Sequence, residues 1–374
     1  MMSNRDYYGD SYGTPKERKS IFWFLAWGVF AVVSIVLWVA LLFTLVAPRV
    51  NPEVWWGFSI LGLLAPVTYI VNFAIAMVWI IRWRWRVALP IIVLLLVGSP
   101  KVTQYVKMET SNHYSEPSRR GMTKILSYNL RFHINDDQEW STNEIVSYID
   151  SIAPDIICLQ ELRVERFEDA LTDKLKRYNS ATSADLGIYT KYPIIARSEY
   201  ISLRDCGESS SMWVDLKIAN DTIRVFNNHL VSTTINHTDD KYITSREFIA
   251  DSLREDKVVD IITRFNSRSE VRAHDSDSLK RIITASPHRV VVCGDFNDTP
   301  MSYTYHTMAK GLKDSFVECG VGVPYTYRGF MNWLRIDYIL AQEGIEFQSY
   351  MIDKEIKLSD HLPVIAHFIL TKNN

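Results

Sequence analysis

Two long stretches without a charged side chain constrain this chain of 374 residues more than any other feature. They cover residues 21–47 and 54–81. At about 1.5 Å per residue, each stretch is long enough as a helix to cross the roughly 30 Å hydrocarbon core of a bilayer. Eight of the eleven tryptophans precede residue 101, several of them near the ends of these stretches, where their rings favour the membrane interface. We therefore predict two membrane spans, because buried core helices are rarely this long.

A third apolar stretch, residues 87–100, is uncharged over only 14 residues. That length reaches about 21 Å, but flanking arginine and lysine side chains can extend to the two membrane surfaces. We predict a third span over residues 86–103, which gives a transmembrane region over residues 21–106. A signal peptide is the alternative reading of the first stretch, but 27 uncharged residues exceed its usual core.

The basic residues predict the orientation of these spans. Three of them lie within residues 16–19 and three more within residues 82–86, whereas the first loop has only Arg49, opposed by Glu53. Basic loops remain in the cytoplasm. We predict an integral protein of a bacterial cytoplasmic membrane, with residues 1–20 as a cytoplasmic tail. Three crossings place the C-terminal domain outside the cytoplasm, whereas two would leave it inside.

The C-terminal part alternates strand-like and helix-like segments after a mostly polar linker at residues 107–121. Strands are expected at residues 124–129, 155–160, 187–190, 212–218, 222–228, 336–340 and 363–370, and one from residue 289. Helices are expected at residues 166–177, 245–265 and 271–285, and one opened by a capping box at Ser141 and Glu144. This mixture indicates one α/β domain over residues 122–374.

The charge of this part bears on the partners it can bind. From residue 101 onward, acidic residues outnumber basic ones by 39 to 33. A protein that holds nucleic acid chiefly through its backbone charge would more often be basic, so tight non-specific DNA binding is disfavoured.

The phrase Gly-Asp-Phe-Asn-Asp at residues 294–298 closes an apolar, strand-like run. In extended backbone, Asp295 and Asn297 point to the same side, and Gly294 allows another backbone or a ligand to come close. Such a carboxylate and carboxamide can orient an attacking water and donate a hydrogen bond to a phosphate oxygen. Alone the phrase is only moderately specific, because Gly-Asp also marks ordinary turns.

Four more phrases place polar groups next to predicted strands, and a further carboxylate accompanies them. They are Ser-Tyr-Asn at 127–129, Leu-Gln-Glu at 159–161, Asn-Asn-His at 227–229, Ser-Asp-His-Leu-Pro at 359–363, and Asp337 within Arg-Ile-Asp-Tyr at 335–338. Each has an ordinary reading as a cap, a turn or a solvated face. Together, at the ends of successive apolar strands, they indicate one phosphate-hydrolysing site.

In order and wording these phrases resemble the endonuclease/exonuclease/phosphatase superfamily, which includes deoxyribonuclease I, apurinic/apyrimidinic endonucleases, neutral sphingomyelinases and inositol-polyphosphate phosphatases. The resemblance runs from about Met122 to Leu370. It implies a four-layered α/β sandwich, in which two packed mixed β-sheets are flanked by helices and the site lies at one sheet edge.

The resemblance also implies a divalent cation. Glu161 matches the principal metal ligand, with Asn129 beside it and Asp360 as a further candidate. Hard oxygen ligands of this kind suit Mg²⁺ or Mn²⁺.

The catalytic roles carry over in the same way. Asp295 would orient or deprotonate the attacking water, and Asn297 would hydrogen-bond the scissile phosphate. His361, paired with Asp337, would bind the phosphate and stabilise its charge. His229 would act likewise or protonate the leaving oxygen, although no carboxylate that pairs with it can be assigned.

Two departures disfavour a role in base-excision repair. Arg131 stands where apurinic/apyrimidinic endonucleases carry an acidic residue, and His229 stands where they carry a tyrosine.

These observations predict a membrane-anchored, metal-dependent hydrolase of phosphoester bonds. The favoured reaction is nuclease-like, on extracytoplasmic nucleic acid; the alternatives are a sphingomyelinase-like phosphodiesterase that cleaves lipid head groups, or a phosphatase. The other partner is the lipid bilayer, and no protein partner is predicted. Tyr327, Phe330 and Trp333 suit a stacked base, a lipid or a core position equally well. A catalytically silent binding module is the main alternative, but none of the site residues is lost. A transporter fits poorly, because the spans carry no buried charge.

Overall fold

The computed structural model describes residues 21–108, 121–135, 137–199, 201–203, 209–233, 254–329 and 332–371. The predicted N-terminal tail and most of the predicted linker lie outside the described residues.

Four helices make up the apolar N-terminal part: α1 (Ile21–Val46), α2 (Gly57–Leu63), α3 (Ala65–Ile81) and α4 (Trp85–Val102). Helices α1 and α4 are long and apolar enough to cross a membrane, and α2 with α3 adds a third candidate if the bent pair counts as one span. The stretch at 54–81 is therefore not one straight helix, because α2 and α3 meet at 72°. Pro66 in the first turn of α3 explains the break, since proline cannot donate to the preceding turn and clashes with it.

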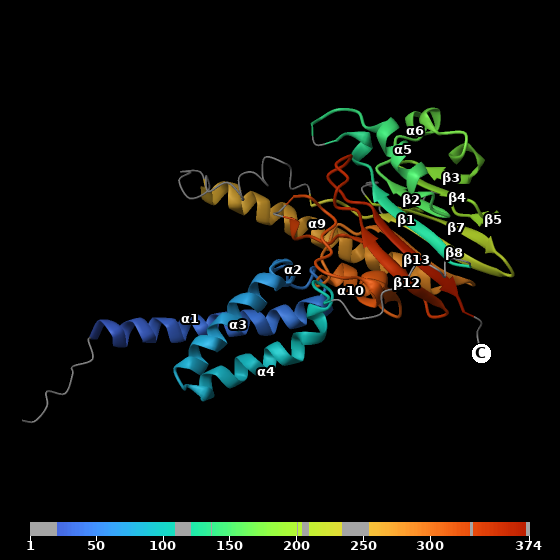
Figure 1. Cartoon of the computed structure of the whole chain (residues 1–374). Helices are drawn as coiled ribbons and strands as arrows, with labels where there is room; N and C mark the ends of the chain where they lie inside the picture. Colours follow the sequence, from blue (N-terminus) through green and yellow to red (C-terminus); the bar gives the residue numbers. More distant parts are fainter. Residues whose placement is uncertain are drawn as a thin grey trace, which may run out of the picture.

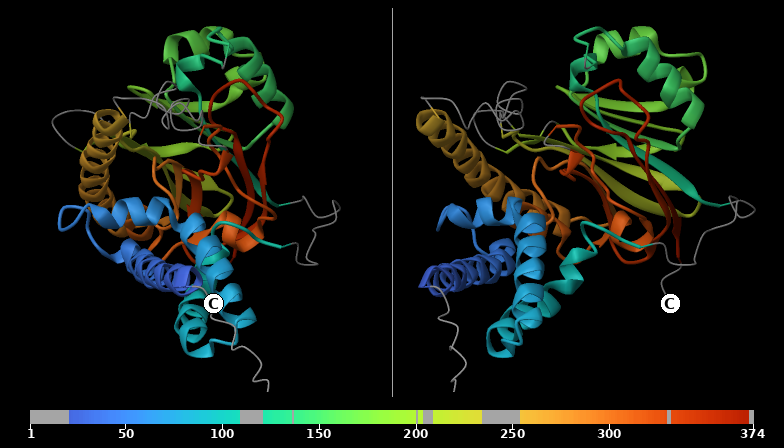
Figure 2. Two further views of the ribbon diagram at one scale, coloured as in Figure 1. Left: turned by 90° about the vertical axis from the view of Figure 1, so that its left-hand side faces the viewer. Right: turned by 60° about the vertical axis from the view of Figure 1, so that its left-hand side comes forward.

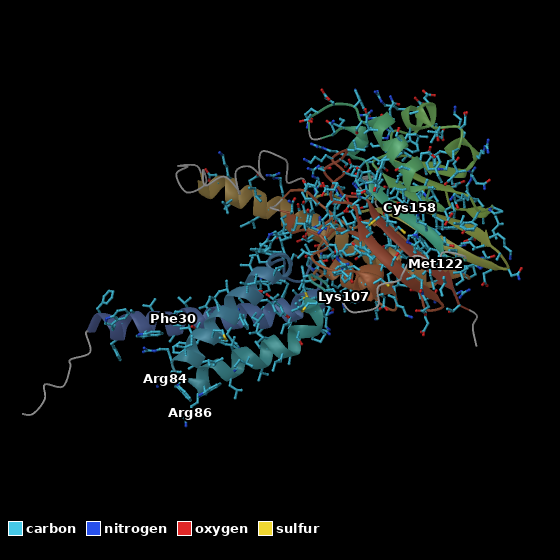
Figure 3. All side chains as sticks on the ribbon, viewed as in Figure 1. Phe30, Arg84, Arg86, Lys107, Met122 and Cys158 are labelled. Atoms are coloured by element: carbon cyan, nitrogen blue, oxygen red, sulfur yellow. The ribbon has the colours of Figure 1, made fainter. Side chains whose placement is uncertain are left out.

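The helices form a bundle at one end of the α/β domain. In Figures 1 and 2, α1, α3 and α4 extend side by side away from the sheets. Asn72 Nδ2 of α3 donates to the carbonyl oxygen of Leu37 in α1 at 3.0 Å, and Trp79 Nε1 donates to Ser34 Oγ at 3.1 Å. Figure 3 shows Arg84 and Arg86 at the end of the bundle farthest from the domain.

Helix α2 contacts the α/β domain directly. A Cβ atom added to Gly62 would come within 2.5 Å of the carbonyl oxygen of Met301, so the two backbones are packed against each other. The bend at Leu64 thus turns the end of α2 toward the domain.

Two mixed sheets form the domain. The first has the order β12 (Ile345–Ile352), β13 (Val364–Leu370), β1 (Thr123–Asn129), β2 (Ile156–Gln160), β4 (Leu186–Thr190) and β3 (Asn179–Ser183). The second has the order β10 (Lys313–Asp314), β11 (Asp337–Ala341), β9 (Arg289–Asp295), β8 (Asp221–His229), β7 (Ser210–Ile218) and β5 (Ile194–Arg197), with β6 (Ile201–Ser202) also paired to β7. Strand pairs β1–β2 and β8–β9 are parallel.

The layers follow from three apolar clusters. The central cluster lies between the sheets and contains Cys158 of β2 and Cys293 of β9. A second packs α5 (Thr142–Ile152) and α6 (Val164–Ala170) on the outer face of the first sheet. A third packs α9 (Arg254–Thr284) and α10 (Tyr303–Ala309) on the second sheet, with α11 (Ser315–Cys319) nearby. The predicted four-layered α/β sandwich is confirmed.

Three local predictions were wrong. Ser141 precedes α5 but its side chain makes no capping hydrogen bond; its Oγ donates instead to the carbonyl oxygen of Leu358 at 2.9 Å. The helix expected at 166–177 is α6 followed by a separate 3₁₀ turn at Leu175–Arg177. The two helices expected before β9 form one continuous α9 within the described residues, because no helix breaker lies between residues 265 and 271.

Candidate active site

The parallel strand pairs bring the polar strand ends to one edge of the sandwich. Asn129 ends β1 beside Gln160 of β2, and His229 ends β8 opposite Asp295 of β9. The antiparallel strand β11 begins at this edge, so its first residue, Asp337, lies opposite Asp295. Five sequence phrases that are far apart in the chain therefore meet at one place.

Asp295 is the fully buried centre of this group. Its Oδ1 accepts a hydrogen bond from the Asn297 backbone N at 2.8 Å. Its Oδ2 accepts one from Asn129 Nδ2 at 3.0 Å and one from Asn297 Nδ2 at 3.1 Å. Burial and the nearby Asp337 charge raise the pKa of Asp295 to about 6, although His361 and His229 oppose this. A carboxylate with that pKa can accept a proton near neutral pH.

His361 is held between two carboxylates. Its Nδ1 lies 3.0 Å from Asp337 Oδ2, and its Nε2 lies 3.6 Å from Asp295 Oδ2. Burial alone would lower the pKa of His361, but the charges of Asp337 and Asp295 raise it well above the usual value. The backbone N of Asp337 donates to Thr326 Oγ1 at 3.1 Å, and the Tyr327 ring packs edge-on against His361. The ring is therefore fixed in place, and the two carboxylates favour its charged form.

His229 has a carboxylate partner that the sequence phrases did not include. Its Nδ1 lies 3.0 Å from Asp185 Oδ2. Its Nε2 lies 3.4 Å from Glu161 Oε1 but makes no hydrogen bond. Burial would lower the pKa of His229, but the hydrogen bond with Asp185 and the charges of Glu161 and Asp295 raise it to about 9.

Asp185 was missed because its position depends on an unpredicted strand. It lies in the turn between β3 and β4, where Ala184 has a φ of 52°. Because β4 pairs with β2, this turn lies at the same sheet edge as Glu161, and the backbone N of Leu162 donates to the carbonyl oxygen of Asp185 at 2.8 Å. Recognition of residues 179–190 as a hairpin would have indicated Asp185.

Several site residues have strained backbones. Glu161 and Asn297 have φ values of 49° and 52°, and the turn at Arg131–His133 has three consecutive positive φ values. Non-glycine residues in this region cost of order 1–3 kcal/mol each and cluster at functional sites. Gly294 has a φ of 129°, and a Cβ atom there would collide with the backbone of Asn228. The close backbone approach expected at Gly294 is confirmed.

The neighbouring amides have structural roles. Asn227 Oδ1 accepts a hydrogen bond from Gln160 Nε2 at 2.6 Å, which joins the two sheets just beneath the site. Asn228 Nδ2 donates to the carbonyl oxygen of Cys293 at 2.8 Å and its Oδ1 accepts from Ser211 Oγ at 2.7 Å. These buried side chains fix the separation of the strand ends that carry Glu161 and His229.

The carboxylate of Glu161 is the group at this edge that best fits a hard divalent cation. Asn129 Nδ2 lies 3.1 Å from Glu161 Oε1 and 3.0 Å from Asp295 Oδ2, so two carboxylates approach one carboxamide. Like charges at such a spacing repel unless a donor or a cation lies between them. Glu161 keeps 19% of its side chain exposed, which leaves it open to a cation from solvent. Carboxylate oxygens are ligands that Mg²⁺ and Mn²⁺ prefer. The amide oxygen of Asn129 instead accepts a hydrogen bond from the backbone N of Arg131 at 3.0 Å, and its Nδ2 faces Glu161.

A second arrangement of possible ligands lies deeper. One ligand atom each from Asp295, Asp337 and His361 lies within 4.8 Å of the others. The buried His361–Asp337 hydrogen bond already satisfies two of these groups, so Glu161 is the more accessible ligand. Asp360 lies at the rim, where its Oδ2 pairs with Arg131 Nε at 3.5 Å.

The sandwich and its strand-end carboxylates, histidines and amides define an enzyme that hydrolyses phosphoester bonds. The model of the Endonuclease/Exonuclease/phosphatase family matches residues 126–361. The chain belongs to this family, whose members generally use divalent metal ions. A second family model, described only as a domain of unknown function, matches residues 21–105. No curated protein is significantly similar to the chain.

Solved structures resemble the α/β domain at low sequence identity. An endonuclease/exonuclease/phosphatase from Bacteroides vulgatus is 18% identical, with a TM-score of 0.49, over 67% of this chain and 100% of that chain. A mannosyl-6-phosphatase from Bacteroides thetaiotaomicron is 16% identical, with a TM-score of 0.47, over 66% and 100%. The human Nocturnin catalytic domain with bound sulfate is 17% identical, with a TM-score of 0.46, over 67% and 95%.

Replacing Asp185 with asparagine tests the contact with His229. The substitution keeps the shape of the side chain but removes the negative charge that attracts the His229 imidazole, whose Nδ1 lies 3.0 Å from Asp185 Oδ2. We expect kcat to fall by about 10–100-fold with little change in KM, because an orienting partner acts mainly on the transition state. Steady-state kinetics at saturating metal measure this. Asp173→Asn, a substitution in the segment between α6 and β3, is the control and should leave kcat unchanged. Equal kcat values for the two variants would contradict the role of Asp185.

Proposed function

We propose that this chain is a membrane-anchored, divalent-metal-dependent phosphodiesterase that uses in-line attack by water. The observation that carries the proposal is the buried Asp295 carboxylate, held by Asn129 and Asn297 beside the His361–Asp337 pair. One group to position water, one to hold phosphate and one charged imidazole are the components that hydrolysis at phosphorus requires.

Each residue has a separate task in this mechanism. Asp295 orients the attacking water and takes its proton, for which a pKa of about 6 is suited. Asn297 is held next to Asp295 by its own backbone N–H; its Nδ2 donates to Asp295 and to the carbonyl oxygen of Leu230, and would exchange one of these hydrogen bonds for one to the phosphate. His361, kept charged by Asp337, neutralises the negative charge that develops on the phosphate oxygens.

On the opposite side of the reacting phosphate, His229 donates a proton to the leaving oxygen. Asp185 keeps its imidazole oriented and favours its charged form. A divalent cation would be held by Glu161, and by Asn129 once its carboxamide oxygen turns toward it, with Asp360 near the rim; the cation would supply Lewis-acid stabilisation of the phosphate. Apart from the cation and the attacking water, the groups that act in this mechanism are side chains of this chain.

The proposed anchor is the helical bundle. Helices α1 and α4 and the bent α2–α3 pair supply up to three spans. With three spans, Arg84 and Arg86, at the far end of the bundle, would lie in the cytoplasm and the α/β domain outside it, in keeping with the positive-inside rule.

The test is a substrate panel with the full chain in detergent micelles and Mg²⁺ or Mn²⁺. The panel contains bis-(para-nitrophenyl) phosphate, plasmid DNA, RNA, sphingomyelin and phosphatidylinositol phosphates. We expect metal-dependent hydrolysis of the small diester and of one natural class, abolished by a chelator and restored by added metal. Hydrolysis that survives metal removal would contradict the proposed mechanism, and no hydrolysis of any compound by the folded chain would support a silent binding module.

A further inference from the structure

We propose that a cleft between the helical bundle and the α/β domain binds the hydrocarbon tail of a membrane lipid, and that the phosphoester of the same lipid is hydrolysed at the candidate active site. This inference rests on the proposed function and specifies its substrate class.

The cleft has an apolar lining and a volume of about 560 Å³. Such a volume lies within the roughly 300–1,000 Å³ of small-molecule sites. We call it the membrane-side cleft, and its principal wall residues are Pro66, Ile70, Val102, Val106, Tyr325 and Trp333. Two of its walls are therefore the beginning of α3 and the end of α4, and the third is the α/β domain.

Apolar side chains are left uncovered at this junction. Ile70, Val106 and Trp333 are 60%, 41% and 46% exposed, respectively. Exposing apolar surface to water costs about 25 cal/mol per Å², so such a concentration next to membrane helices favours contact with hydrocarbon. The lipid is available at this place without diffusion through water, because α3 and α4 would lie in the bilayer.

The membrane-side cleft and the active site are neighbours along three chain segments. Leu63 lines the active-site pocket and Pro66 lines the cleft, on the two sides of the α2–α3 bend. In the same way, Thr299 and Leu334 line the active-site pocket, and their chain neighbours Met301 and Trp333 line the cleft. The cleft therefore lies next to the pocket that contains His361, with Trp333 lining the first and Leu334 the second.

The same arrangement disfavours a long polymer as substrate. The active-site pocket has a volume of only about 160 Å³, and Leu63 from the helical bundle forms part of its wall. A nucleic acid strand must continue on both sides of the scissile phosphate, whereas the bundle, through Leu63, forms one side of this pocket. A lipid has a small head group on one side and a tail on the other, which matches a small polar pocket beside an apolar cleft.

One cation suits an anionic lipid at this position. Lys101, at the end of α4, lines the cleft, and among the described residues no ion pair involves it. By contrast, the other cation of the lining, Arg335, is buried and paired with Asp314 at 2.8 Å. Lys101 is therefore available for a phosphate or carboxylate oxygen near the membrane surface.

A variant in which a larger side chain fills the cleft distinguishes an effect on tail binding from an effect on catalysis. The full chain carrying Val102→Trp is compared with Val97→Trp, which adds the same bulk to an outward position of the same helix that is 67% exposed. Each variant is reconstituted with a phospholipid extract of bacterial membranes, and the released head groups are quantified by mass spectrometry. Bis-(para-nitrophenyl) phosphate, which has no tail, is assayed in parallel.

We expect Val102→Trp to lower lipid hydrolysis at least tenfold and to leave turnover of the small diester within twofold of the wild type. Val97→Trp should change neither activity. Trp333→Ala, which removes an exposed wall without overfilling the cleft, should raise KM for lipid several-fold and serves if Val102→Trp fails to fold.

Three results would overturn the inference: turnover of the small diester without any lipid hydrolysis, cleavage of plasmid DNA or RNA but not of lipid, or equal lipid hydrolysis by all three variants and the wild type. Failure of the folded wild type to hydrolyse even the small diester would instead refute the proposed function.

Discussion

Replacing Asp295 with asparagine is expected to lower kcat by about 10²–10⁴-fold, the usual contribution of a positioned general base. Asparagine has the same shape but cannot accept the proton of the attacking water. Its amide would also face the donors Asn129 Nδ2 and Asn297 Nδ2, which now bind the carboxylate. Steady-state kinetics on bis-(para-nitrophenyl) phosphate at saturating metal measure the loss.

The thermal midpoint distinguishes lost chemistry from lost structure. Asp295 is fully buried beside Asp337, and these two effects raise its pKa. Removing one of two buried like charges relieves repulsion, so we expect the midpoint of Asp295→Asn to be equal to or above that of the wild type. A variant that keeps kcat within tenfold of the wild type would show that another group activates the water.

Loss of a residue that only hydrogen-bonds a metal ligand weakens metal binding by about 10–100-fold. Because Glu161 itself would bind the metal, we expect its replacement with glutamine to weaken binding by more than this. Glutamine keeps one oxygen but loses the negative charge of the accessible carboxylate near Asn129. Activity titrated against Mg²⁺ and Mn²⁺ should show a half-maximal concentration shifted by at least this factor.

High metal concentration separates the roles of the two carboxylates. Excess metal should restore a large part of kcat in Glu161→Gln but none in Asp295→Asn, since the second variant lacks the base. An unchanged half-maximal metal concentration in Glu161→Gln would place the cation instead among Asp295, Asp337 and His361, where a second set of ligand atoms converges.

Much of the fold and site was predictable because strand ends carry the chemistry. The phrases at Asn129, Glu161, Asp295 and His361 each follow or precede an apolar run, and runs of that kind form strands in a buried sheet. The parallel pairing of β1 with β2 and of β8 with β9 then brings their ends together. Local sequence thus gave both the element and its polar end.

Other features depend on contacts that no local pattern encodes. Strand β3 is short and partly exposed, so the turn that places Asp185 beside His229 has a weak apolar signal. To predict the bend between α2 and α3, one must decide that Pro66 breaks the helix, and the uniformly apolar stretch around it gives no further sign of a break. The membrane-side cleft arises from the packing of α3 and α4 against residues more than 200 positions away, which composition does not reveal.

The position of β13 has a consequence for how the chain is made. This strand lies between β12 and β1, so the first and last strands of the domain are hydrogen-bonded neighbours inside one sheet. Until residues 364–370 leave the ribosome, β1 and β12 both present open edges, which are prone to pairing with other chains. The first sheet can therefore be completed only after β13 has been synthesised. A premature stop before β13 would leave an incomplete sheet rather than a slightly shortened enzyme.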